Sequence, residues 1–352
     1  MNDTATHEKF MKRCFELAKL GLGTAAPNPI VGCVIVYDGK IIGEGYHQKC
    51  GEAHAEVNAI NSVKDKSLLS KSTLYVSLEP CAHQGRTPAC SLLIIEKKIP
   101  SVVISCIDSF AKVSGKGVEM LKNAGVDVTV GILENEGKFI NRRFFTFHEK
   151  KRPYIILKWA ETIDGFIDID RKNPLQKPEW ITNDISRTLV HKWRTEEPAI
   201  MVGTDTAELD NPKLNVREWK GKNPLRITID KNLRLSDNLF LFDKTQKTIV
   251  FTSKNKTNEK YLEFVKLDFN KNIIPQILEY LHKIEVQSII VEGGKKLLDS
   301  FISQNLWDEA RVFIGDKHFY SGVKAPKIKG TIVSKDFLEE STLFVFLPFY
   351  NS

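Results

Sequence analysis

The chain has 352 residues, of which 42% are hydrophobic and 27% charged, as in ordinary globular proteins, and this length allows two domains with separate cores. Its formal net charge is +7, but no dense basic stripe is interleaved with aromatic residues, so nucleic-acid binding is not expected. Most lysines are expected to be solvated surface, although the positive surplus also suits a small substrate that carries phosphate. The sequence has no signal-peptide core, no apolar run of about 20 residues and no disulfide framework, and so predicts a cytoplasmic protein outside the membrane.

The first elements predicted are a helix, a hairpin and a second helix. Apolar residues recur at helical spacing over Thr6–Leu20. Cys33–Tyr37 and Ile41–Tyr46 are predicted to be two strands joined by the Asp38-Gly39 turn, a strong hairpin signal. His54–Asn61 is predicted to form a helix that begins at the most informative motif of the chain.

That motif is His54-Ala55-Glu56, which precedes Pro80-Cys81 and a second cysteine, Cys90. One imidazole and two thiolates are enough for a tetrahedral zinc whose fourth position stays open for water. Zinc lowers the pKa of a bound water toward neutrality, and Glu56 is placed to move protons rather than to bind metal. This order of residues resembles the H-x-E…P-C-x-x-C signature of hydrolytic zinc deaminases, so the sequence predicts a catalytic zinc site.

Other interpretations of these residues stay open on the sequence alone. A structural zinc site closes with a fourth protein ligand, and Cys50 and His47 lie near enough in the sequence to supply one. Free cysteines are also common as small buried hydrophobic residues. The presence of Glu56 beside the ligands favours the catalytic interpretation.

The rest of the first half alternates strands with helices, which predicts a three-layer α/β sandwich. The strand Thr73–Leu78 delivers Cys81 at its carboxyl end. The further strands are predicted at Val102–Ser105 and Asp127–Val130, and the further helices at Cys90–Lys98, Val118–Ala124 and Glu134–Phe147. The charged connector His148–Pro153 ends in a helix breaker and separates a first domain, residues 1–148, from a second, residues 152–352.

The spacing of the two cysteines narrows the class of deaminase. Eight residues separate them, where deaminases of nucleosides and nucleic acids normally have two. The segment His83-Gln84-Gly85-Arg86-Thr87-Pro88-Ala89-Cys90, together with Pro27-Asn28-Pro29-Ile30-Val31-Gly32 and Gly43-Glu44-Gly45-Tyr46-His47, resembles the deaminase of riboflavin biosynthesis. This resemblance implies a cytidine-deaminase-like fold with zinc on His54, Cys81 and Cys90. It also implies that the pyrimidine and its phosphoribosyl arm are held by Asn28, His47, His83 and Arg86.

The second half again has an α/β pattern, for which a parallel sheet is expected. Its predicted strands are Tyr154–Trp159, Ile200–Gly203, Arg226–Asp230, Thr248–Thr252 and Ser288–Glu292, and its predicted helices are Asp184–Arg194 and Lys295–Ser303; the tail after Trp307 is assigned only as closing strands and loops. A Rossmann fingerprint is absent from the sequence. In Glu292-Gly293-Gly294-Lys295, however, two glycines lie between a strand and a helix, where backbone amides can approach a phosphate.

Several motifs of this half resemble the reductase that is fused to the deaminase in the riboflavin pathway. They are Leu157-Lys158-Trp159-Ala160, Ile163-Asp164-Gly165, Trp180-Ile181-Thr182, Trp193-Arg194, Gly203-Thr204-Asp205-Thr206 and the run from Leu209 to Arg217. The resemblance implies a dihydrofolate-reductase-like α/β domain that uses NADPH. It places Lys158 and Asp210 near the reacting sugar carbon as catalytic candidates.

The same resemblance assigns binding residues in the second half. The implied cofactor contacts are Ala160, Trp180, Thr206, Asp210, Lys231, Gly294, Lys295, Lys296, Leu297, Leu298, Asp299 and Ser300. The implied substrate contacts are Pro178, Arg194, Leu214, Arg217 and Glu292. Two positions depart from the family: Pro178 replaces a small hydroxyl residue, and Phe166-Ile167-Asp168 replaces a segment with a basic residue and alanine.

The expected protein is therefore a bifunctional zinc deaminase and NADPH reductase acting on a phosphoribosylaminopyrimidine. Zinc hydrolysis would convert 2,5-diamino-6-(5-phosphoribosylamino)pyrimidin-4(3H)-one to the corresponding aminouracil, and NADPH would then reduce the ribosyl group to ribityl. A homo-oligomer, dimer or tetramer, is expected. The alternatives are a single-activity nucleoside or tRNA deaminase and a non-catalytic zinc module that binds a partner.

Overall fold

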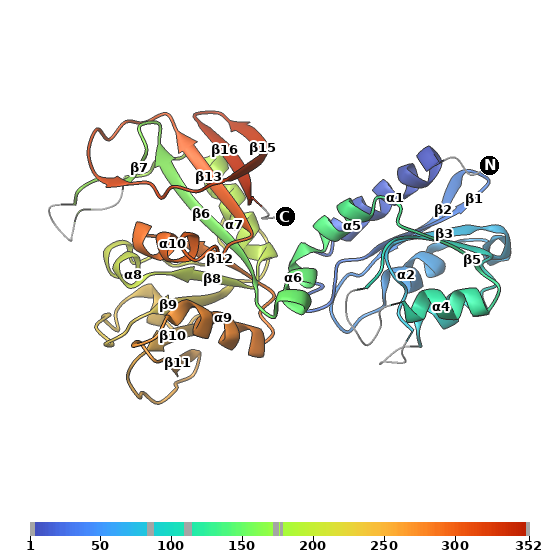
Figure 1. Cartoon of the computed structure of the whole chain (residues 1–352), viewed down its shortest axis with the longest axis horizontal. Coiled ribbons are helices and arrows are strands. Elements are labelled where there is room, and N and C mark those ends of the chain that lie inside the picture. The colour runs from blue at the N-terminus through green and yellow to red at the C-terminus, as the bar shows by residue number, and fades with distance from the viewer. Residues whose placement is uncertain (1–3, 83–87, 109–114, 172–175, 177–178, 350–352) are drawn as a thin grey trace. The chain divides into compact units, whose positions relative to one another are not determined.

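The computed structural model describes residues 4–82, 88–108, 115–171, 176 and 179–349 (Figure 1). The chain divides into two compact units, Met1–Lys151 and Arg152–Ser352. Among the described residues, no helix is both long enough and apolar enough to cross a membrane.

The first unit is built on a five-stranded sheet with the order β2-β1-β3-β4-β5. Its strands are β1 Gly32–Tyr37, β2 Lys40–Tyr46, β3 Thr73–Leu78, β4 Ser101–Cys106 and β5 Asp127–Val130. Its helices are α1 Thr4–Lys19, α2 Ala55–Ser62, η1 Lys66–Lys71, α3 Cys90–Glu96, α4 Lys116–Asn123, α5 Glu134–Ile140 and α6 Arg142–Lys150. The predicted hairpin is confirmed: β1 and β2 are antiparallel, and the turn residues Asp38 and Gly39 both have positive φ, at 49° and 68°.

Helices cover both faces of this sheet, which confirms the predicted three-layer sandwich. Figure 1 shows α1 and α5 on one face and α2 and α4 on the other. On the α1 face, Phe10 and Phe15 pack with Val34 and Val103 of the sheet. On the opposite face, the core formed by α2, α3 and α4 meets strand residues such as Ile35. Because side chains alternate along each strand, both faces of the sheet become apolar.

The single helix predicted over Glu134–Phe147 is wrong, because the structure has two helices there. Asn141 lies between α5 and α6, and its side chain turns away to bind the backbone of Ile30. Its Oδ1 accepts from the N–H of Ile30 at 2.9 Å, and its Nδ2 donates to the carbonyl of Ile30 at 2.9 Å. The helix therefore breaks at Asn141, whose side chain holds the loop at Ile30, 111 residues earlier in the chain.

The second unit contains a nine-stranded sheet with the order β11-β10-β9-β8-β12-β6-β13-β16-β15. Its strands are β6 Tyr154–Thr162, β8 Ala199–Val202, β9 Leu225–Ile229, β10 Thr248–Thr252, β11 Leu262–Lys266, β12 Ser288–Glu292, β13 Glu309–Gly315, β15 Gly330–Leu338 and β16 Ser341–Pro348. A separate ribbon pairs β7 Phe166–Asp168 with β14 Val323–Lys324. The helices are α7 Asp184–Glu196, α8 Thr204–Asp210, η2 Phe240–Phe242, α9 Ile273–Lys283 and α10 Lys295–Ile302.

The expected parallel sheet is confirmed from β11 to β13, and the tail adds β16 and β15 in antiparallel register. Its two faces have separate cores. One contains Leu281 of α9 and Phe301 of α10, helices that lie in front of the sheet in Figure 1. The other contains Val190 and Trp193 of α7. Layers of this kind leave the carboxyl ends of the parallel strands as the place for a ligand.

Candidate functional sites

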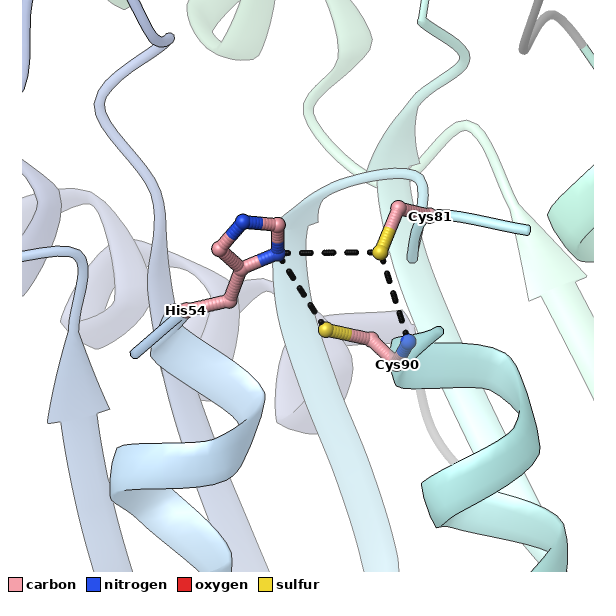
Figure 2. Close-up of side chains that lie close together, drawn as sticks. All are labelled: His54, Cys81 and Cys90. Atoms are coloured by element: carbon pink, nitrogen blue, oxygen red, sulfur yellow. Dashed lines mark hydrogen bonds between the residues drawn. The ribbon is translucent and has the colours of Figure 1, made fainter. Parts of the chain in front are cut away.

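The three predicted zinc ligands meet at the ends of secondary-structure elements in the first unit (Figure 2). His54 is the N-cap residue of α2, Cys81 follows β3, and Cys90 is the first residue of α3. Residues that are far apart in the sequence converge because β3 directs the chain between the N-termini of two helices. Helix N-termini carry partial positive charge, which favours thiolates.

A zinc ion fits among these three side chains. Nδ1 of His54 lies 3.6 Å from the sulfur of Cys81 and 3.3 Å from the sulfur of Cys90. Zinc–sulfur bonds of about 2.3 Å and zinc–nitrogen bonds of about 2.0 Å in a tetrahedron separate the nitrogen from each sulfur by about 3.5 Å. The ligand atoms all lie within 4.8 Å of one another, so one ion can reach all three.

The surroundings of Cys81 favour its deprotonated form, which metal binding requires. Hydrogen bonding from the side chain of Cys90, and then from His54, outweighs burial and lowers the pKa of Cys81 to about 4. The backbone N–H of Cys90 also donates to the sulfur of Cys81 at 3.3 Å.

Glu56 has the environment of a group that carries protons. It lies in the first turn of α2, two residues after His54, and only 3% of its surface is exposed. Burial raises the pKa of Glu56 to about 7, and the side chain of Cys90 is in hydrogen-bonding contact with its carboxyl. A carboxyl of this pKa beside the ligands can accept and return a proton near neutral pH.

The structure bears on the question of a fourth protein ligand. Among the described residues, the cluster able to hold a metal consists of His54, Cys81 and Cys90. Cys50 is exposed. His47 uses both ring nitrogens elsewhere: Nδ1 contacts the carbonyl of Ala53 at 3.1 Å, and Nε2 contacts Nδ2 of Asn28 at 3.1 Å. Among the described residues, three side chains are therefore placed to hold the zinc, the number of protein ligands found in catalytic zinc sites.

Two of the predicted substrate contacts of the first unit are brought to the metal centre. The ring of His47 lies edge-on to that of His54 with centroids 5.3 Å apart, and Asn28 is held by His47. Since Nδ1 of His47 faces a carbonyl, it carries the proton, and Nε2 accepts from the Asn28 amide. Burial lowers the pKa of His47, which keeps this ring neutral. His83 and Arg86 lie outside the described residues.

The second unit has a cavity of about 970 Å³ at the carboxyl ends of its parallel strands. It is lined by residues from β6, from the segment after β8 and from the turn after β12. Fourteen of the predicted residues line it, namely Lys158, Ala160, Trp180, Arg194, Thr206, Asp210, Leu214, Arg217, Glu292, Gly294, Lys295, Lys296, Leu297 and Ser300. This is the position at which open α/β sheets bind ligands.

Three charged side chains form a largely buried cluster in this cavity. Lys158 of β6 and Glu292 of β12 are register partners, with Nζ of the lysine 3.9 Å from Oε1 of the glutamate. Nη2 of Arg194 lies 3.3 Å from Oε2 of Glu292. Burial lowers the pKa of Lys158, and although burial acts to raise the pKa of Glu292, the charges of Lys158 and Arg194 bring it below its usual value.

This cluster has unused hydrogen-bonding capacity. Nε of Arg194 and Oε1 of Glu292 are buried without a hydrogen-bond partner. Buried polar atoms without partners are costly, so these two atoms point to a polar ligand in the cavity. The cluster carries one net positive charge, which suits an anionic group on that ligand.

The turn after β12 has the structure of a phosphate site. Gly293 has φ +112°, and a Cβ atom there would lie 2.8 Å from Oγ1 of Thr206, so glycine is required. Oγ1 of Thr206 accepts from the N–H of Gly294 at 2.8 Å and fixes this turn. Gly294 caps α10 without a side-chain hydrogen bond, which leaves the helix amides able to bind an anion. These features fit a nicotinamide dinucleotide.

Arg171 is a cavity residue that the sequence interpretation missed. It bridges two carboxylates, with Nη1 2.7 Å from Asp210 and Nη2 2.7 Å from Asp168. Asp168 belongs to the segment that departs from the family, and Asp210 is a predicted catalytic residue whose pKa is raised by burial. No motif or spacing in the sequence marks Arg171, because its partners are distant or unusual for the family.

The remaining predicted contacts differ in their placement. Lys231 does not line the cavity and lies with Nζ 5.6 Å from the centroid of the Phe269 ring. Leu298 is fully buried in the apolar core, so its side chain is not available to a cofactor. Asp299 forms an ion pair with Lys295 at 3.0 Å. Pro178 lies outside the described residues.

Comparison with protein families and with relatives agrees with both sites. Residues 4–106 match the family described as the cytidine and deoxycytidylate deaminase zinc-binding region, and residues 153–319 match the RibD C-terminal domain. The riboflavin biosynthesis protein RibD of Aquifex aeolicus is 40% identical over 324 residues, which are 90% of this chain and 88% of the relative. That of Actinobacillus pleuropneumoniae is 39% identical over 325 residues, 89% of this chain and 85% of the relative.

Solved structures agree over the whole chain. A diaminohydroxyphosphoribosylaminopyrimidine deaminase/5-amino-6-(5-phosphoribosylamino)uracil reductase from Thermotoga maritima has a TM-score of 0.89 at 37% identity and covers 98% of this chain and 99% of its own. RibD from Acinetobacter baumannii has a TM-score of 0.87 at 29% identity, with the same coverage of 98% and 99%. The chain therefore belongs to the RibD family of riboflavin biosynthesis, bifunctional enzymes in which a zinc-binding deaminase domain is followed by a reductase domain that uses NADPH.

Proposed function

We propose that this chain catalyses two successive reactions on one phosphoribosylaminopyrimidine. Residues 1–148 would hydrolyse the exocyclic amine of 2,5-diamino-6-(5-phosphoribosylamino)pyrimidin-4(3H)-one, with consumption of water and release of ammonia. Residues 152–352 would then reduce the ribosyl group of the aminouracil to ribityl with NADPH. The observation that carries the proposal is the convergence of His54, Cys81 and Cys90 beside the buried carboxyl of Glu56.

In the first unit, Glu56 is the group that moves protons. When bound, zinc supplies the activation of water for attack on the ring carbon that carries the amine. Glu56 would accept one proton from that water and give it to the ring nitrogen, then accept the second proton from the same oxygen and give it to the departing amine, so that ammonia leaves as the carbonyl forms. Asn28 presents its amide to the pyrimidine in the orientation that His47 sets.

In the second unit, the cavity orients sugar, phosphate and cofactor. When bound, NADPH supplies the hydride. Arg194 and Arg217 suit the substrate phosphate, since a guanidinium pairs with phosphate through two hydrogen bonds. Lys158 is proposed as the proton donor, because burial lowers its pKa, and Asp210 as the second polar group near the reacting carbon. Thr206 and the Gly293-Gly294 turn hold the cofactor phosphates.

The test uses the zinc-loaded full-length chain and the phosphoribosylamino diaminopyrimidinone, with ammonia and NADPH absorbance followed together. Release of ammonia, followed by loss of NADPH absorbance only after deamination, is the expected result. Ammonia release from free cytidine or adenosine instead would favour a nucleoside deaminase. Ammonia release without NADPH oxidation would overturn the assignment of the second unit.

We further propose a homo-oligomer, dimer or tetramer, in the cytoplasm. Among the described residues, β15 pairs only with β16, and its edge exposes Ile332, Val333 and Phe337 at 52%, 48% and 75%. The unpaired backbone N–H and C=O groups along the edge of β15 are a template for pairing with a second copy. Light scattering of the native chain and of a Phe337→Glu variant tests this: a monomeric native chain would contradict it. The six free cysteines are consistent with a reducing compartment.

A further inference from the structure

The first unit contains a second buried carboxylate, Glu79, that the proposed reaction does not use. Only 5% of Glu79 is exposed, and the residue follows β3 directly. Among the residues that the structure describes, no lysine, arginine or histidine forms an ion pair with Glu79. A buried carboxylate without a cation requires several hydrogen-bond donors.

Those donors are four backbone N–H groups. Oε1 accepts from Gly117 at 2.8 Å and from Val118 at 3.3 Å, in the first turn of α4. Oε2 accepts from Gly115 at 2.9 Å and from Asp108 at 3.3 Å, just before α4 and just after β4. One side chain therefore binds the end of β3 to the chain that follows β4 and to the N-terminus of α4, where the helix dipole favours its charge.

The contact between α4 and the end of β3 is unusually close. A Cβ atom on Gly117 would lie 2.0 Å from the carbonyl oxygen of Pro80, so only glycine permits this approach. The N–H of Glu79 also donates to the carbonyl of Cys106 at 3.0 Å, which extends the pairing of β3 with β4. Backbone and side chain of Glu79 are thus both fixed.

Cys81 follows Glu79 by two residues, with a proline between them. Proline fixes its own φ, so the direction in which Cys81 leaves the strand depends on how firmly Glu79 is held. On its other side, Cys81 is held by α3: its carbonyl accepts from Oγ of Ser91 at 2.8 Å, and its sulfur accepts from the N–H of Cys90 at 3.3 Å. The thiolate therefore lies between two anchors, one on α3 and one, through Glu79, on α4.

We propose that Glu79 is a positioning residue of the metal centre, which fixes the direction of the Cys81 sulfur by joining the end of β3 to α4. The inference rests on the proposed zinc-dependent deamination, since it concerns the metal of that site. Groups that orient metal ligands through a second layer of hydrogen bonds typically change metal affinity by about 10- to 100-fold when altered. Glu79 would act through the backbone of its own segment instead of touching a ligand atom.

The test is the Glu79→Gln variant of the full-length chain. Glutamine keeps the shape of the side chain but turns an NH2 group toward two of the four N–H donors. The zinc dissociation constant is measured by competition with a chromophoric chelator, and the Co²⁺-substituted protein gives a visible spectrum that reports the geometry of the thiolate ligands. We expect zinc to bind about 10- to 100-fold more weakly and the cobalt bands to change in position and intensity.

Asn141→Asp is the matched control. It is also a shape-conserving change of a buried side chain that binds backbone groups in this unit, and it loses the donation to Ile30. It should keep the native zinc affinity and cobalt spectrum. An equal change in this control would mean that loss of stability, not positioning, weakens the metal, and would overturn the proposal.

A native zinc affinity and cobalt spectrum in Glu79→Gln would overturn it as well. If that variant does not fold, Glu79→Asp keeps the charge and shortens the side chain by one methylene, and the same two measurements decide in the same way. Failure of the proposed reaction is distinguishable, because it would show as a native chain that binds zinc and releases no ammonia. The metal measurements on the variants stand apart from that result.

Discussion

The buried carboxyl of Glu56 predicts that a Glu56→Gln variant loses activity and gains stability once the metal is removed. Burial raises the pKa of Glu56 from 4.5 to about 7 in the folded chain. The carboxyl group of Glu56 therefore ionises at a lower pH in the unfolded chain than in the folded chain. As the pH rises, the folded state loses stability relative to the unfolded state. The penalty is absent well below about pH 4.5 and complete above about pH 7, where the difference of about 2.5 between the two pKa values corresponds to about 3 kcal/mol. Glutamine has no charge and avoids this penalty.

Cysteine and tryptophan residues lie in different units, so the unfolding of each unit can be followed separately. All six cysteines lie in the first unit and all five tryptophans in the second. Cys14 and Cys33 are fully buried, so their reaction with an aromatic disulfide that labels thiols even in acid reports unfolding of the first unit. Tryptophan fluorescence follows the second unit in the same denaturant titration.

The expected result depends on pH. At about pH 8, metal-stripped Glu56→Gln should expose its thiols at higher denaturant than the native chain, by about 3 kcal/mol, and at about pH 5 by less than about 1 kcal/mol. The tryptophan transition should not move. With zinc bound, ammonia release should fall by about 10²- to 10⁴-fold while zinc is retained. An equal stability difference at both pH values, or none at pH 8, would refute the reasoning.

Three further changes separate the two sites. Cys81→Ser removes one zinc ligand, so bound metal and ammonia release should both be lost. NADPH oxidation with the aminouracil supplied as substrate should continue at the native rate. A loss of NADPH oxidation as well would contradict the assignment of the two reactions to separate units. Lys158→Met removes the proposed proton donor, so NADPH oxidation should fall by about 10²- to 10⁴-fold with ammonia release unchanged, as a coupled assay shows. Thr206→Val leaves the N–H of Gly294 without its acceptor, so calorimetry should find NADPH binding weaker by about 1–3 kcal/mol, and native affinity would exclude a role for this turn in the cofactor site.

The features that the sequence predicted correctly are those encoded locally. The hairpin at Asp38-Gly39 and the helix over Thr6–Leu20 follow from turn chemistry and from apolar periodicity, and both are present. The convergence of His54, Cys81 and Cys90 could be predicted, because an imidazole and two thiols in this order are rare for any other purpose. The break at Asn141 was missed, because its cause is the backbone of Ile30, which is distant in the sequence.

Three further features of the structure are missing from the sequence-based prediction for different reasons. Helix α9 at Ile273–Lys283 has no counterpart among the predicted elements, although the sequence contains its signal: Asn272 caps it, and Ile274, Ile277 and Leu281 have helical spacing. The role of Arg171 was not accessible from the sequence, because its two ion pairs become visible only when the cavity is assembled. Glu79 belongs to the same class, since its four donors come from a segment about 30 to 40 residues later.

The confinement of every cysteine to the first unit gives the two activities separate vulnerabilities. An oxidant, an alkylating agent or a soft metal ion such as Cd²⁺ attacks thiolates and finds none beyond residue 106. Reagents of this kind would therefore inhibit the deamination and leave the reduction active. A cell exposed to them would accumulate the diaminopyrimidine before the block, and supplying the deaminated compound would restore flux without repair of the protein.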